Sequence, residues 1–340
     1  MKVRTSLYLS FRASLILALS LGALLPGCAI STRQTDAVLS NPGSVGPPAY
    51  RIADVPYIKQ TENYCGPATL TMAMRYHGHN VGVEEIASQV YTPGKKGTLQ
   101  QDMIGSARRQ GMLAVQIQGL PNLFKELRAN HPVIAFFNLG LSWYPMYHYA
   151  LVTGYDVAGP SIFMHSAGTE NKEWSMRKFE RNWSQSWGLV VLPPTELSVA
   201  ADELEHSGAA AGLEAVGRVK EAELVYRNIL KRWPESFGAL VGMGNLTYAA
   251  KDFAGSVAYL KRATHFHPLS AEAWHNRATA EGAAGLTKRA IASAKRAMEL
   301  CPPEATETYR ASLREWLLAP AAKSLKPRRE ARAEPGRHSL

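Results

Sequence analysis

The 340-residue chain contains few cysteines, and the features of several common protein classes are missing from it. Three cysteines are too few, and the wrong parity, for a disulfide framework. His, Cys, Asp and Glu never occur at metal-ligand spacings, and no glycine-rich phosphate loop occurs, so the sequence predicts neither a metal nor a cofactor. The hydrophobic fraction of 46% and the charged fraction of 19% are typical of a globular protein, here of about two domains.

The net charge of +10 first suggests a nucleic-acid binder, but the excess basic residues lie at the two ends of the chain. Residues 1–27 carry +3 and residues 323–340 carry +4, which leaves only +3 for everything between. We therefore do not expect nucleic acid as a partner. The tail over 319–340 lacks apolar periodicity, and we expect it to be disordered.

The N-terminus has the pattern of an export signal. A basic segment is followed by an apolar run over 13–25, which is shorter than the roughly 20 residues that span a bilayer. Leu24-Leu25-Pro26-Gly27-Cys28 resembles a bacterial lipoprotein cleavage site, although proline is unusual there. The resemblance implies a signal peptide over 1–27 and a lipid anchor on Cys28. The alternative is a plain signal peptide beside an unmodified cysteine.

The residues after Cys28 bear on location and on the start of the fold. Ala29, in place of an aspartate, favours the outer membrane facing the periplasm by the sorting pattern of such lipoproteins. Residues 28–50 are polar and rich in proline and glycine, so we predict a flexible tether there.

Cys65 lies where a loop is expected to enter a helix. The run Cys65-Gly66-Pro67 precedes an apolar-periodic segment, and proline is favoured in the first helical turn. The free N–H groups and the positive end of a helix favour a thiolate, which is the attacking form of a cysteine nucleophile. Gln60, five residues upstream, offers an amide that could donate to an oxyanion. A buried structural thiol is the alternative interpretation of Cys65.

A histidine base is predicted on a strand over 147–156, which is rich in aromatic and β-branched residues. Alternation places His148, Ala150 and Val152 on one face, as in the wall of a cleft. The sequence permits contact between His148 and Cys65 without demonstrating it. An ordinary core or surface histidine is the alternative.

The pattern Gln-x4-Cys-Gly-Pro-Ala, with the later strand His-Tyr-Ala-Leu-Val, resembles the papain-like peptidases that remove double-glycine leaders in bacteriocin export. The resemblance covers about residues 50–195 and implies an α+β papain-like cysteine peptidase domain, which we place over 51–197. It implies that Cys65 is the nucleophile, His148 the base and Gln60 the oxyanion donor. It also implies a peptide or protein substrate.

The third catalytic position departs from that family. The family has an aspartate on the next strand, whereas this chain has Ser161-Ile162-Phe163-Met164-His165-Ser166. We take His165 as the third member, with Ser166 as the choice after a one-residue shift. Cell-wall endopeptidases of the NlpC type often place histidine third, which keeps peptidoglycan open as a substrate. His165 without any catalytic part is an equal alternative.

An aromatic loop precedes His148. Trp143 and Tyr144 are predicted to line a substrate groove, or else simply to cover the core.

A second domain begins after Pro193-Pro194. Prolines at 234, 268 and 302 recur every 34 residues, with small residues at matching positions, and this resembles tetratricopeptide repeats. We therefore predict an all-α repeat domain over 203–318, ending in a capping helix over 305–318 and binding a protein partner. Cys301 is expected to be a packing residue.

Three functions remain open at this stage. The first is a lipid-anchored periplasmic cysteine peptidase whose repeats recruit a partner or substrate. The second is a lipoprotein scaffold that binds peptides without cutting them. The third is a cell-wall endopeptidase or amidase.

Overall fold

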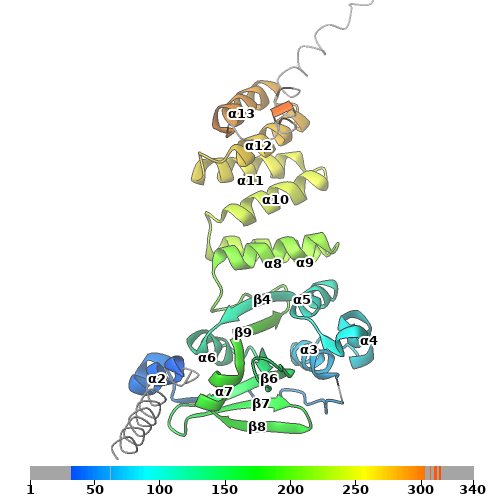
Figure 1. The fold of residues 1–340 in the computed structure, drawn as a ribbon. Helices are drawn as coiled ribbons and strands as arrows, with labels where there is room; N and C mark the ends of the chain where they lie inside the picture. The colour runs from blue at the N-terminus through cyan, green and yellow to red at the C-terminus, as the bar shows by residue number, and fades with distance from the viewer. Residues whose placement is uncertain (1–31, 62, 303–306, 308–309, 312–313, 315–340) are drawn as a thin grey trace, which may run out of the picture.

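The computed structural model describes residues 32–61, 63–302, 307, 310, 311 and 314. They form a sheet-containing domain from which paired helices stack away in one direction (Figure 1). The predicted signal peptide, Cys28 and the basic tail lie outside the described residues, as does most of the predicted capping helix. Within the described part of the chain, no helix is long and apolar enough to cross a membrane.

The first domain is built on an antiparallel sheet of seven strands, whose central strands are almost wholly buried because their sequences are near-continuous apolar runs. The order is β4-β9-β5-β6-β7-β8, and β1 pairs with the far half of β6. A short ribbon of β2 (Tyr91–Thr92) and β3 (Gly97–Thr98) stands apart. The sheet strands are β1 (Ala49–Arg51), β4 (Leu113–Gln118), β5 (Val133–Asn138), β6 (Tyr147–Asp156), β7 (Ser161–Ser166), β8 (Thr169–Ser175) and β9 (Trp183–Leu192).

Helices cover this sheet, and the most deeply buried of them is α3 (Cys65–Tyr76), which packs against β6. Its residues from Gly66 to Met74 are all buried, so its first turn is held firmly where it meets the sheet. In Figure 1, α3, α4 and α5 gather on one side of the sheet, with α2 and α6 on the other. The remaining helices of this domain are α4 (Val83–Val90), α5 (Gln100–Arg109), α6 (Leu120–Arg128), α7 (Met176–Asn182) and the 3-10 turns Pro42–Val45 and Pro93–Lys95.

The prediction of a flexible tether over 28–50 is wrong for its described part. Residues Arg33–Ser40 form the helix α2, and β1 joins the sheet soon afterwards. The amides of Gln34 and Thr35 donate to the two carboxylate oxygens of Glu180 on α7, at 2.9 and 2.7 Å. An anion at a helix N-terminus satisfies its free N–H groups, and the buried Val38 then anchors the helix in the core.

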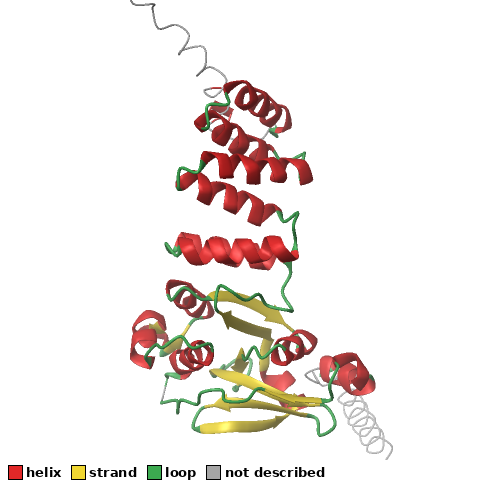
Figure 2. Ribbon diagram, turned by 180° about the vertical axis from the view of Figure 1, so that it is seen from behind, coloured by secondary structure: helices red, strands yellow, loops and turns green. Residues whose placement is uncertain are grey.

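Within the described residues, the second domain contains three helix pairs at the predicted 34-residue spacing, stacked one after another (Figure 2). Small residues are required where paired helices approach most closely: a Cβ on Gly244 would lie 2.6 Å from Leu260 Cγ. Ala210 and Ala278, at the matching positions, are completely buried. The helices are α8 (Glu203–Ala215), α9 (Val219–Arg232), α10 (Phe237–Ala249), α11 (Phe253–Phe266), α12 (Ala271–Ala283) and α13 (Thr287–Leu300).

The turn inside each helix pair needs a left-handed residue, and one of the three is not glycine. Gly217 and Gly285 have φ values of 79° and 77°, whereas Lys251 occupies the same position with φ 64°. We expect Lys251→Gly to raise the free energy of unfolding by about 0.5–1 kcal/mol, because glycine adopts this backbone without steric cost. The melting temperature of the Lys251→Gly variant measures this change. Gly217→Ala is the matched control and should lower the free energy of unfolding. A lower melting temperature for Lys251→Gly would contradict the assignment.

The two domains share one continuous hydrophobic core. Leu213 of α8 packs in the same buried cluster as Leu113 of β4, the edge strand of the sheet. A Cβ on Gly212 would lie 2.4 Å from the guanidinium carbon of Arg108, so α5 and α8 are in close contact. The first repeat is therefore packed directly against the sheet-containing domain and is not connected to it by a free linker alone.

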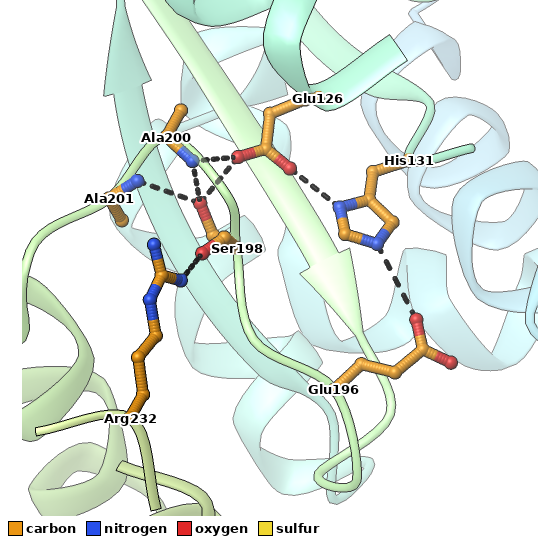
Figure 3. Close-up of polar contacts among 7 residues, drawn as sticks. All are labelled: Glu126, His131, Glu196, Ser198, Ala200, Ala201 and Arg232. Atoms are coloured by element: carbon orange, nitrogen blue, oxygen red, sulfur yellow. Dashed lines mark hydrogen bonds and ion pairs between the residues drawn. The ribbon is translucent and has the colours of Figure 1, made fainter. Parts of the chain in front are cut away.

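A buried carboxylate fixes the segment that joins the domains (Figure 3). Glu126 of α6 is fully buried, and one of its oxygens accepts hydrogen bonds from the Ser198 hydroxyl at 2.5 Å and the Ala200 amide at 2.7 Å. Its other oxygen accepts from His131 Nδ1 at 2.6 Å. Arg232 of α9 donates to the Ser198 carbonyl oxygen at 2.9 Å, which extends the network into the first repeat.

Candidate active site

Cys65 is the first residue of α3, as predicted, and its thiol is half-buried. Burial raises the pKa of Cys65 above its ordinary value, while the backbone N–H groups of Tyr149, Gly66 and Cys65 itself act in the opposite direction without cancelling it. The expected preference for a thiolate is therefore not realised in the resting site, where the thiol is protonated at neutral pH. The influence of the Tyr149 amide places the sulfur near β6, the strand that also carries His148.

Gly66 allows β3 to pack against the first turn of α3. A Cβ at this position would lie 2.6 Å from Cβ of Thr98, so no larger residue fits without moving β3. The Thr98 carbonyl oxygen in turn accepts a hydrogen bond from the Tyr149 hydroxyl at 3.1 Å. These contacts place the β2–β3 loop on one wall of the space around Cys65.

His148 lies on β6, as predicted, and is half-buried. Its Nε2 atom lies 3.0 Å from the Ser166 hydroxyl oxygen, which leaves Nδ1 as the nitrogen able to take a proton from a thiol. Burial, with a smaller contribution from the positive charge of Lys172, lowers the pKa of His148 to about 4. The imidazole is therefore neutral at pH 7 and has the form required of a base.

Ser166, and not His165, is the residue that contacts His148. Both nitrogens of His165 are engaged elsewhere, Nε2 with the Val55 carbonyl oxygen and Nδ1 with the Asn171 amide, each at 3.1 Å. The prediction of His165 as third member is therefore wrong as to contact. The structure selects the one-residue shift.

A β-bulge causes this shift. Leu151 and Val152 pair with His165 and Met164, but the register changes by one residue before Gly154, so Thr153 is the extra residue. If the register at Gly154 continued without the bulge, His165 would lie on the same face of the sheet as His148. With the bulge, His165 moves to the opposite, buried face and Ser166 takes its place.

Gln60 is held firmly beside Cys65. Its side-chain oxygen accepts from the Ala167 amide at 2.9 Å, and its Nε2 donates to the Thr69 hydroxyl at 3.1 Å. Its backbone amide donates to the Ala167 carbonyl oxygen at 3.1 Å. One hydrogen of Nε2 remains for a ligand, so the geometry is compatible with the predicted donor role.

The three predicted residues meet in a single cavity of about 890 Å³. Cys65, His148 and Gln60 all line it, although they come from three separate segments of the chain. Beyond these three, its described lining consists of Thr61, Asn63, residues 95–100, Phe136, Pro145, Tyr147, Tyr149, Ala167, Ser184 and Gln185.

Trp143 and Tyr144 do not belong to this lining, contrary to the prediction. They lie in the loop between β5 and β6, where they are 78% and 68% exposed. The loop folds back on itself through a bridge between Leu141 and Tyr144, which turns its tip outwards. Pro145 and Tyr147, closer to His148, line the cavity instead.

Among the described residues, the other cysteine has a packing role and no metal site is found. Cys301 is buried against Ala297, Met298 and Trp274, as expected of a packing residue. No group of His, Cys, Asp and Glu among the described residues could hold a metal ion. Lys95 and Lys96, which are adjacent in the cavity wall, were not predicted from the sequence because no motif marks them.

Comparison with known proteins agrees with this architecture. Residues 52–190 match the model of the Peptidase_C39 like family. A double glycine motif protease from an AMS/PCAT transporter, solved with its leader peptide, is 21% identical over 42% of this chain and 94% of that one, with a TM-score of 0.33. The peptidase domain of Streptococcus ComA, a bi-functional ABC transporter, is 19% identical over 41% and 98%, with a TM-score of 0.35.

The helical part has its own neighbours. The first TPR of Spaghetti, solved with an HSP90 peptide, is 20% identical over 35% of this chain and 93% of that one, with a TM-score of 0.32. No curated protein matched the chain. The sheet-containing domain thus matches the Peptidase_C39 like family model over residues 52–190, and the helices that follow it have the 34-residue spacing of tetratricopeptide repeats.

Proposed function

We propose that this protein is a cysteine peptidase that cleaves peptide bonds with Cys65 and His148. The observation that carries the proposal is the meeting of Cys65, His148 and Gln60 in one cavity, with the sulfur at the start of α3 and the imidazole on the adjoining strand. A nucleophile, a base and an oxyanion donor within one cavity are the parts that acyl transfer requires.

The reaction follows from these positions. The thiol proton of Cys65 passes to His148 Nδ1 while the sulfur bonds to the substrate carbonyl carbon. The resulting oxyanion accepts hydrogen bonds from Gln60 Nε2 and the Cys65 backbone amide. The C–N bond then breaks, and the leaving amine takes the proton from His148. Water, deprotonated by His148, hydrolyses the thioester and restores the free thiol.

We further propose a double-glycine substrate, an envelope location and a recruiting role for the repeats. The family match and the double glycine motif protease among the structural neighbours support the first. The lipoprotein-like sequence ending in Cys28 supports a lipid anchor in the outer membrane, facing the periplasm. A groove of about 420 Å³ lined by residues of α8, α9, α10 and α12 supports peptide capture by the repeats.

A non-catalytic peptide-binding scaffold is the second candidate, and one observation favours it. Ser166 stands where a carboxylate would stabilise the imidazolium of His148, and burial leaves both members of the resting pair neutral. The cell-wall endopeptidase loses its main support, because His165 does not contact His148.

Cleavage of peptides with a central Gly-Gly pair tests the proposal. The full chain is incubated with a randomised decapeptide library, and the products are identified by mass spectrometry. We expect cleavage by the unmodified protein, none by Cys65→Ala, and a loss of about 100-fold or more with His148→Ala. Cys301→Ala is the matched control and should retain activity. Peptides that bind without being cut would instead favour the scaffold.

A further inference from the structure

The wall of the cavity carries two neighbouring lysines, Lys95 and Lys96. The β2–β3 turn that presents them is well defined: Lys96 has a left-handed backbone with φ 48°, and its amide donates to the Pro93 carbonyl oxygen at 3.0 Å. Both side chains are exposed, and neither forms an ion pair with any described residue. Two unpaired cations therefore face the space above Cys65.

Two further lysines add to the positive charge at this site. The charge of Lys172 reaches His148, since it contributes to the lowered pKa of that imidazole. Lys59 Cε lies 4.0 Å from the position of a Cβ on Gly168, next to the cavity residue Ala167. Two lysines thus line the space in which a substrate would lie, and two more lie close to residues that line it.

The described lining of the cavity contains no carboxylate that could offset this positive charge. Apart from Lys95 and Lys96, its side chains are neutral. Asp102 and Glu84 act electrostatically on Tyr149 and Tyr64 but do not line the cavity. Glu62 lies outside the described residues. A cleft lined by charge of one sign attracts ligands of the opposite sign.

The lysine charges do not serve the nucleophile. The pKa of Cys65 is raised by burial and opposed only by backbone amides, and no lysine is among the causes. Lys172 disfavours the imidazolium of His148, which a stabilising role would not do. Lys95 and Lys96 contribute to neither pKa shift, so their charges remain available to a ligand in the cavity.

We propose that the cavity selects peptides that carry a glutamate or aspartate side chain beside the scissile bond, with Lys95 and Lys96 pairing to that carboxylate. The inference deepens the proposed function by naming its substrate class. Binding of such a peptide, however, requires no cleavage. Each exposed ion pair contributes modestly, so the two together should give roughly tenfold tighter binding of an acidic peptide than of its neutral isostere.

The test measures binding to the full chain carrying Cys65→Ala, so that cleavage cannot interfere. Fluorescent decapeptide pools share a central Gly-Gly pair and have glutamate, glutamine or lysine fixed on either side of it. Fluorescence anisotropy should show the tightest binding for the glutamate pool, weaker binding for the glutamine pool and the weakest binding for the lysine pool. In 0.5 M salt the difference in affinity between the pools should shrink, because the short Debye length screens the ion pairs.

Lys95→Gln combined with Lys96→Gln should abolish the preference, and Lys288→Gln with Lys295→Gln, on the last repeat, is the matched control that should keep it. Equal binding of the three pools, no measurable binding of the glutamate pool, or a preference that survives the cavity double substitution would each overturn the inference. Acidic peptides that bind selectively but are never cut by the unmodified protein would overturn the proposed function alone.

Discussion

Replacing Ser166 with aspartate is expected to raise the rate at which iodoacetamide alkylates Cys65 at about pH 6–7 by at least about tenfold. The serine hydroxyl lies 3.0 Å from His148 Nε2, so a carboxylate there would contact the imidazole directly. An opposite charge at that distance raises the pKa of His148 from about 4 and stabilises the imidazolium. The imidazolium in turn favours the Cys65 thiolate, which is the alkylated species.

The pH dependence of the unmodified protein follows from the same two groups. His148 is neutral above its lowered pKa of about 4, so no imidazolium assists the thiol near neutrality. The raised pKa of Cys65 then delays the thiolate to alkaline pH, and alkylation should climb there without a plateau near pH 7. Ser166→Asn is the control, because asparagine is similar in size to aspartate but uncharged, and this variant should keep the pH profile of the unmodified protein. Fast alkylation of the unmodified protein at pH 6 would contradict the neutral pair.

Glu126→Ala is expected to lower the free energy of unfolding by about 3–5 kcal/mol, the second large effect. The fully buried carboxylate accepts hydrogen bonds from the Ser198 hydroxyl, the Ala200 amide and His131. Its removal deprives the buried Ser198 hydroxyl and His131 of their acceptor, leaves the Ala200 amide only its longer bond to the Ser198 hydroxyl at 3.3 Å, and opens a void between α6 and the segment joining the domains. The unfolding transition of the full chain in urea measures the loss.

Two further variants separate this network from general damage. Glu126→Gln keeps one oxygen for Ser198 and Ala200, and His131 can accept at Nδ1 in its other tautomer, so we expect a loss of only about 1–2 kcal/mol. Glu196→Ala removes a half-exposed carboxylate 3.5 Å from His131 and should cost less than about 1 kcal/mol. Equal stability of Glu126→Ala and Glu196→Ala would show that the buried carboxylate does not secure the junction.

The sequence was informative wherever the structural signal is local. Cys-Gly-Pro marks the start of α3 because proline and a free helix N-terminus act within one turn. The prolines spaced by 34 residues mark the repeats for the same reason, since each follows the second helix of its own pair. His148 could be placed on a strand because aromatic and β-branched residues cluster around it.

What the sequence could not reveal depends on distant residues or on register. Ser166 replaces His165 beside His148 because of one extra residue at Thr153, and no composition signals a bulge there. The helix α2 depends on Glu180, more than a hundred residues away, so its own polar sequence looks like a tether. Predictions from pattern fail at such positions because the stabilising partner is supplied by tertiary structure.

The early start of α2 also limits how far the proposed anchor can reach. Five residue steps separate Cys28 from Arg33, and a fully extended chain spans no more than about 3.6 Å per step, or about 18 Å in all. An acyl group on Cys28 would therefore hold α2, and with it the sheet-containing domain, close to the bilayer surface. The repeats extend from the opposite end of the molecule (Figure 1), so they would project outward from that surface. Cleavage would then take place close to the membrane, while the repeats would bind partners further from it.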